Sequence, residues 1–117
     1  MHVLIIEDEP MIALDIQCFL EELGADTTDV ADTEDDALSL AGEHRPDLIT
    51  ADYSLRRGTG PQAVSRIQHD FGAIPVIYIT GQPERCRAAG SNASAISKPI
   101  LWLQLAQAVK RHNLLLS

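Results

Sequence analysis

The chain is poor in cationic residues and in cysteine, and it has no long apolar run. Nine lysines and arginines stand against 17 aspartates and glutamates, so the formal net charge at pH 7 is -8. This balance argues against nucleic-acid binding, which needs a positively charged surface, and favours proteins as partners. No apolar run approaches the roughly 20 residues that span a bilayer, so we expect no membrane segment.

The two cysteines, Cys18 and Cys86, offer neither zinc-site spacing nor a disulfide framework, which favours a reducing, cytoplasmic location. The histidines also lack ligand spacing, and we expect all four at the surface: His2, His44, His69 and His112.

A chain of 117 residues can bury one core, so a single domain over residues 1–117 is expected. Apolar runs of strand length alternate five times with segments of helical period, which is typical of a doubly wound α/β domain with a parallel sheet. The expected strands are residues 3–6, 27–31, 47–51, 74–79 and 95–97.

Three features refine this outline. Residues 27–31 are polar, which suits an edge strand, whereas 47–51 and 74–79 are continuously apolar and suit the centre of the sheet. Helices are expected to begin near Pro10, after Thr33, near Pro61 and near Leu101. Residues 82–94 are small and polar without an apolar stripe, so a fourth helix there would be short or mobile.

Charged side chains follow three of these strands directly. Glu7 and Asp8 come after the first strand, Asp52 after the third and Lys98 after the fifth. The carboxyl ends of parallel strands share one edge of the sheet, where ligands bind, so these groups should meet. Clustered carboxylates repel one another unless a cation joins them, and hard oxygen ligands suit Mg²⁺. A lysine in the same cleft needs an anion, and a phosphoryl group on one carboxylate would supply it.

The motifs VLIIEDEP, LITADYSL, VIYITG and ISKP together resemble the receiver domain of two-component response regulators over essentially the whole chain. The segment from Tyr78 to Gly81 resembles the Phe-Ala-Thr-Gly-like fourth strand of a single-domain subgroup in alphaproteobacterial general stress signalling. The resemblance implies a flavodoxin-like five-stranded sheet with strand order 2-1-3-4-5.

The resemblance also implies a role for each site residue. Four groups would bind Mg²⁺: Asp8, Asp52, the backbone carbonyl of Ser54 and, through water, Glu7. Asp52 would be the phosphoacceptor, while Lys98 and Thr80 would contact the phosphoryl oxygens. A cis peptide is expected before Pro99.

Two departures from the family pattern bear on signalling. Ala95 stands where many receivers carry an aromatic switch residue, and Arg56 replaces a common proline. With its neighbours up to Gly60, Arg56 forms a basic, flexible loop that could attract a donor's phosphate or an acidic partner.

The function implied is that of a Mg²⁺-dependent phosphoacceptor in a two-component phosphorelay. A histidine kinase or phosphotransfer protein would donate the phosphoryl group, and a downstream regulator protein would respond, with no DNA-binding output domain expected. Such a protein is not an enzyme beyond slow autodephosphorylation.

Two alternatives stay open. Ala95 and Arg56 also suit a constitutive receiver-like binding module that does not need phosphorylation. An aspartate-nucleophile phosphatase of the haloacid dehalogenase type is disfavoured, because Tyr53 and Ser54 follow Asp52 where that family places a second aspartate.

Overall fold

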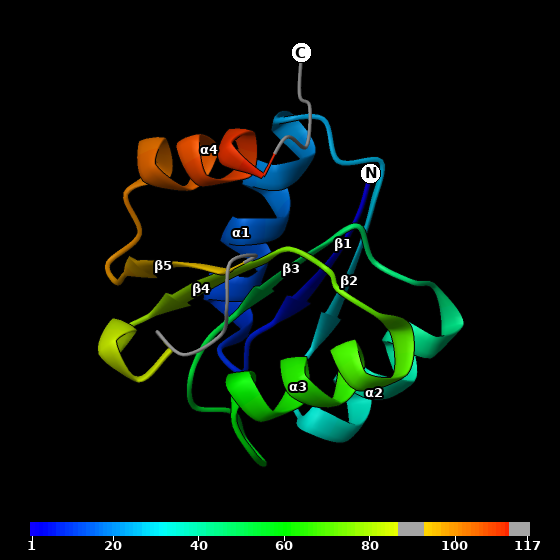
Figure 1. The fold of residues 1–117 in the computed structure, drawn as a ribbon. Coiled ribbons are helices and arrows are strands. Elements are labelled where there is room, and N and C mark those ends of the chain that lie inside the picture. Colours follow the sequence, from blue (N-terminus) through cyan, green and yellow to red (C-terminus); the bar gives the residue numbers. More distant parts are fainter. Residues whose placement is uncertain (87–92, 113–117) are drawn as a thin grey trace.

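The computed structural model describes residues 1–86 and 93–112, which form a five-stranded parallel sheet with a helix layer on each face (Figure 1). The strand order is β2-β1-β3-β4-β5, the flavodoxin-like order expected. The strands are β1 (His2–Ile6), β2 (Thr27–Ala31), β3 (Leu48–Ala51), β4 (Val76–Thr80) and β5 (Ala93–Ser97).

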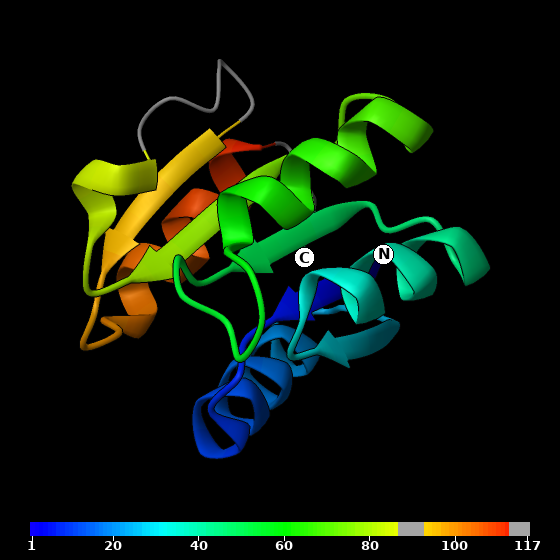
Figure 2. The ribbon, with the colours of Figure 1, turned by 90° about the horizontal axis from the view of Figure 1, so that it is seen from below.

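Helices cover both faces of the sheet, as Figures 1 and 2 show. The helices are α1 (Pro10–Glu22), α2 (Glu34–Glu43), α3 (Gly60–Phe71) and α4 (Trp102–Arg111), with a short 3₁₀ helix, η1, at Pro83–Cys86. α1 and α4 lie on one face, and α2 and α3 on the other. Within the described ranges, none of the helices has the length and apolar character required to cross a bilayer.

The sheet separates two hydrophobic cores because successive side chains of a strand point to opposite faces. Leu4 and Ile6 of β1 pack toward α2 and α3, while Val3 and Ile5 pack toward α1 and α4. All five residues of β1 are buried, as a central strand covered on both faces requires. β2 lies at one edge of the sheet, as its polar sequence indicates.

The helix starts follow local capping chemistry. The Thr33 hydroxyl accepts a hydrogen bond from the Asp36 amide at 3.1 Å and caps α2, the capping pattern expected from the sequence. The Thr59 hydroxyl caps α3 in the same way, accepting from the Gln62 amide at 3.2 Å.

Some boundaries differ from those expected. β4 begins at Val76 rather than residue 74, because Pro75 has no N–H to donate to the ladder, and it extends to Thr80. β5 begins at Ala93, so residues 93–94 belong to a strand rather than to the loosely helical segment expected over 82–94. The start of that segment forms the four-residue η1, and residues 87–92 lie outside the described part of the chain.

The prediction that all four histidines lie at the surface is wrong for His2, whose exposed fraction is 5%. β1 lies between β2 and β3, so even its first side chain is covered. The ring nitrogens lie 2.7 Å from the Thr27 hydroxyl and 3.1 Å from an Asp29 carboxylate oxygen, and the ring stacks on His44. Hydrogen bonds at both nitrogens allow the imidazole to be buried.

Candidate functional site

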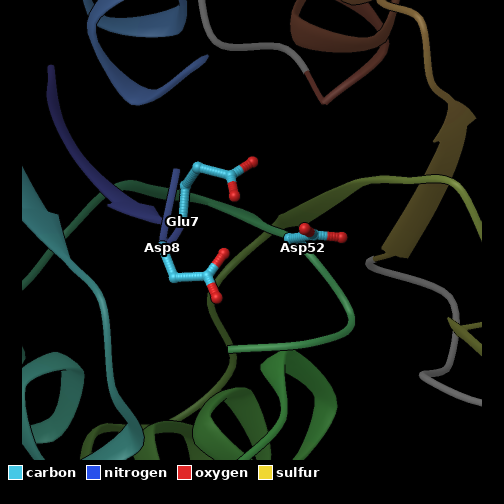
Figure 3. A group of neighbouring side chains, drawn as sticks. All are labelled: Glu7, Asp8 and Asp52. Atoms are coloured by element: carbon cyan, nitrogen blue, oxygen red, sulfur yellow. The ribbon is translucent and has the colours of Figure 1, made fainter. Parts of the chain in front are cut away.

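Glu7, Asp8 and Asp52 form one carboxylate cluster (Figure 3). β1 and β3 are neighbours in the sheet, and Ile6 pairs with Ala51, so the residues that follow these strands lie side by side. One carboxylate oxygen from each of the three lies within 4.8 Å of the others. Among residues 1–86 and 93–112, no other group of three potential metal ligands lies this close together.

Lys98, which follows β5, extends its ammonium group into this cluster. Its Nζ lies 2.9 Å from Glu7 Oε1 and 3.0 Å from Asp52 Oδ2, and the peptide bond to Pro99 is cis. Burial lowers the pKa of Lys98, but the hydrogen bonds that its ammonium donates to Glu7 and Asp52, with the charges of these carboxylates, outweigh burial and leave the pKa raised. Lys98 is therefore a fixed positive charge beside Asp52.

Glu7 is the most deeply buried acid of the cluster, with 3% of its surface exposed. Burial raises its pKa to about 7; the Lys98 ammonium opposes this shift, and the Asp52 charge adds to it. One lysine therefore does not compensate the negative charge gathered here, and the cluster favours a further cation.

The donor set fits Mg²⁺. The three groups offer hard carboxylate oxygens, which Mg²⁺ prefers. Ligand oxygens about 2.1 Å from one octahedral ion lie about 3 to 4 Å apart. The observed spread of up to 4.8 Å lets two carboxylates bind directly after a small movement, with a third acting through water.

The backbone around Asp52 is fixed by short contacts. The Asp52 amide donates to the Ile6 carbonyl at 3.0 Å, and the Tyr53 amide donates to Asp52 Oδ1 at 2.7 Å. Gly60 lies against this turn: a Cβ added there would meet the Asp52 carbonyl oxygen at 1.7 Å. Only glycine fits at this position, so the turn after β3 and the start of α3 are in direct contact.

Ser54 lies in the β3–α3 loop, residues 52–59, and is exposed. It forms an isolated antiparallel bridge with Thr59, whose two hydrogen bonds run from the Gly60 amide to the Tyr53 carbonyl and from the Leu55 amide to the Gly58 carbonyl. Neither bond uses the Ser54 carbonyl, and no other hydrogen bond within residues 1–86 and 93–112 does, so that oxygen can accept a ligand.

Thr80 ends β4 and is buried, with 1% exposed. Its hydroxyl oxygen accepts a hydrogen bond from the Gln82 amide at 3.0 Å. Accepting this bond leaves the hydroxyl proton free to be donated to another group.

Arg56 pairs with a neighbouring acid. Its guanidinium contacts both carboxylate oxygens of Asp32, at 3.2 and 3.3 Å. This two-point contact raises the pKa of Arg56 and lowers that of Asp32. The loop charge is therefore partly neutralised, which weakens its attraction for an outside anion.

Two acids near the site were not predicted from the sequence. Glu9 lies 3.5 Å from the Lys98 ammonium, and its place in the same acidic run was the only available signal. Glu34 accepts a hydrogen bond from the Thr59 amide in the β3–α3 loop at 3.0 Å. Nothing in the local sequence indicates that contact, which joins residues 25 positions apart.

Comparisons with known proteins agree with this geometry. Residues 3–110 match the family model of the response regulator receiver domain. The phyllosphere-induced regulator PhyR of Methylorubrum extorquens is 46% identical over 86 residues, which cover 72% of this chain and 32% of that protein. The chain therefore spans about a third of the length of this relative.

Two solved structures are similar over nearly the whole chain. The receiver domain of PhyR from Erythrobacter litoralis has a TM-score of 0.86 at 29% identity, covering 99% of this chain and 92% of that one. The receiver domain of the sensor histidine kinase PA1611 from Pseudomonas aeruginosa, with magnesium in its active-site cleft, has a TM-score of 0.81 at 26% identity and covers 94% of each chain. The chain belongs to the response regulator receiver domain family and is similar to the PhyR receivers of general stress signalling.

Proposed function

We propose that the chain is a Mg²⁺-dependent phosphoacceptor in which Asp52 receives a phosphoryl group and the altered domain then acts through contacts with other proteins. One observation carries the proposal. A carboxylate at the end of a central strand has a lysine ammonium 3.0 Å away and two further carboxylates beside it, a set that can hold a cation.

Each residue has a distinct part in the proposed transfer. A carboxylate oxygen of Asp52 attacks the phosphorus in line, the new O–P bond forms, and the bond to the donor breaks with its electron pair leaving on the donor. Lys98 then pairs with the phosphoryl oxygens, and Thr80 donates its hydroxyl proton to one of them. The Tyr53 amide holds one oxygen of Asp52 and so orients the carboxylate.

The metal site would use the neighbouring acids. Asp8, Asp52 and the Ser54 carbonyl would bind Mg²⁺ directly, and Glu7 would reach it through water. The ion would neutralise charge on the transferring group. The ion and the Lys98 ammonium would share these carboxylates, since the ammonium lies 2.9 Å from Glu7 Oε1 and 3.0 Å from Asp52 Oδ2.

The proposed donor is a histidine kinase or a phosphotransfer protein in the cytoplasm, and the proposed target is a downstream regulator protein. Slow autodephosphorylation would be the only catalytic step.

The test is intact-mass measurement after incubation with acetyl phosphate and Mg²⁺. The parent should gain one phosphate, and Asp52→Ala should gain none. Glu9→Gln is a matched control: Glu9 is also an acid near Lys98, but it is 60% exposed and lies outside the cluster, so this variant should behave as the parent. Equal phosphate gain by the parent and Asp52→Ala would contradict the proposal.

A second function, constitutive binding without phosphorylation, is favoured by Ala95, which is exposed on the edge strand β5 and offers no aromatic side chain to reorient. Partner affinity discriminates the two functions. Affinity that changes with Mg²⁺ and beryllofluoride, a phosphoryl mimic, supports the phosphoacceptor, whereas unchanged affinity supports the constitutive module.

A further inference from the structure

We propose that Glu34 is a positioning residue that holds the β3–α3 loop in place and thereby sets the position of the Ser54 carbonyl. The inference rests on the proposed function, in which that carbonyl binds Mg²⁺. Glu34 is the first residue of α2, and its side chain contacts the loop at Thr59. It would act through the loop backbone and would contact neither metal nor phosphate.

The contact between Glu34 and the loop is made by both backbone and side chain. Glu34 Oε2 accepts from the Thr59 amide at 3.0 Å, and the Glu34 amide donates to the Arg57 carbonyl at 3.3 Å. The carboxylate lies directly over Gly58, where an added Cβ would meet Oε2 at 2.0 Å. Gly58 has a φ of +85°, so glycine suits both the loop conformation and the space beneath the carboxylate.

Thr59 connects this contact to the candidate metal site. Ser54 and Thr59 face each other as the non-hydrogen-bonded pair of an antiparallel bridge, so the N–H of Thr59 points away from Ser54. That outward amide needs an acceptor, and Glu34 supplies it. If the Glu34 carboxylate is removed, the Thr59 amide loses its hydrogen-bond acceptor and the backbone at Thr59 becomes free to move. Ser54, which is paired with Thr59, then no longer has a fixed position.

Arg66 on α3 holds the carboxylate from the other side, with its Nη1 3.4 Å from Glu34 Oε1. The same nitrogen lies 3.1 Å from Asp35 Oδ1. Asp35 therefore shares the charge, the helix turn and the arginine partner of Glu34. Its side chain is 90% exposed, against 15% for Glu34, and it makes no hydrogen bond with the described residues of the β3–α3 loop.

This likeness makes Asp35→Ala the matched control for Glu34→Ala. Both remove one negative charge from the first turn of α2 and one partner of Arg66, and only Glu34→Ala removes the acceptor of the Thr59 amide. Glu34→Gln keeps an acceptor oxygen and should restore much of the effect. If Glu34→Ala fails to fold, Glu34→Asp takes its place in the comparison with Asp35→Ala, because it keeps the negative charge but its side chain is one methylene too short to reach the Thr59 amide.

Two measurements are needed. In the metal-free protein, amide hydrogen exchange at Thr59 should accelerate about tenfold or more in Glu34→Ala and stay within about twofold of the parent in Asp35→Ala. In a Mg²⁺ titration followed by amide chemical shifts, the concentration for half-saturation should rise about tenfold in Glu34→Ala, the range expected when an outer-shell support is lost. The phosphorylation rate at saturating Mg²⁺ should stay within about twofold, since the chemistry itself is untouched.

The outcomes are distinguishable. A parent that binds Mg²⁺, together with Glu34→Ala and Asp35→Ala variants that match in exchange and in Mg²⁺ affinity, overturns the inference and leaves the proposed function standing. A parent that neither binds Mg²⁺ nor gains phosphate overturns the proposed function, and the role of Glu34 in it falls too.

Discussion

At the scale of single residues, the site gathers negative charge in a buried place. Glu7 is almost wholly enclosed, and its carboxylate lies against Lys98 with Asp52 beyond. Burial disfavours the ionised form of Glu7 by more than Lys98 favours it, so its pKa rises to about 7. The metal-free protein is therefore less stable with Glu7 ionised than it would be with an uncharged group of the same shape.

Glu7→Gln should accordingly stabilise the metal-free protein at pH 8. The folded state holds a proton on Glu7 up to about pH 7, whereas the unfolded chain releases it near the ordinary glutamate pKa of 4.5. The folded state therefore binds more protons across this window, and parent stability falls as pH rises from about 5 to 7. Urea unfolding should show a gain of about 2 kcal/mol for Glu7→Gln at pH 8 and little change at pH 4.5.

Glu9→Gln is the control, since Glu9 also lies near the Lys98 ammonium but is largely exposed. The free energy of unfolding of this variant should equal that of the parent at both pH values. A Glu7→Gln variant less stable than the parent at pH 8 would show that the ion pair with Lys98 outweighs burial.

Gly60→Ala tests the close approach of α3 to Asp52. A Cβ would lie 1.7 Å from the Asp52 carbonyl oxygen and 2.9 Å from its carbonyl carbon, so the backbone must shift. We expect a loss of about 2 to 4 kcal/mol in the free energy of unfolding. In Gly81→Ala, no atom of the described residues beyond the chain neighbours lies within 4 Å of the added Cβ, so stability should change by less than about 1 kcal/mol. Equal effects of the two substitutions would contradict the packing described.

At the scale of elements, sequence patterns predicted the strands well where burial dictated them. β1, β3 and β4 are buried along their lengths and appear as apolar runs, and the polar β2 is an edge strand. The boundaries were less predictable because they depend on partners distant in sequence, as with the start of β4 after Pro75. The burial of His2 depends on hydrogen bonds of its ring with Thr27 and Asp29 on the neighbouring strand β2, which no local sequence pattern reveals.

Thr33→Ala tests the cap of α2. The Thr33 hydroxyl accepts a hydrogen bond from the Asp36 amide, which has no backbone partner at the helix N-terminus. We therefore expect the free energy of unfolding in urea to fall by about 1 kcal/mol. Ser39→Ala removes a hydroxyl from an exposed position inside the same helix and should cost nothing, because alanine is the better helix former. A Thr33→Ala variant as stable as Ser39→Ala would refute the capping role.

At the scale of the whole molecule, the sheet order brings the ends of β1, β3 and β5 to one edge and so assembles the site. Glu7, Asp8, Asp52 and Lys98 could be foreseen because each lies within two residues of the end of a strand. The contacts of Glu34 with Thr59 and of Arg56 with Asp32 could not, since each joins the β3–α3 loop to a residue about 25 positions away in the sequence. Site residues that follow a strand are thus more predictable than residues that support the site through contacts between distant segments.

The most direct test of Mg²⁺-dependent phosphorylation at Asp52 is to identify the residue that carries the phosphate. The protein is phosphorylated with acetyl phosphate and Mg²⁺, the acyl phosphate is reduced with borohydride, and the modified residue is identified by peptide mass spectrometry. We expect that Asp52 alone is converted to homoserine and that chelating Mg²⁺ abolishes the conversion. Conversion at another carboxylate, or at Asp52 to the same extent without Mg²⁺, would contradict it.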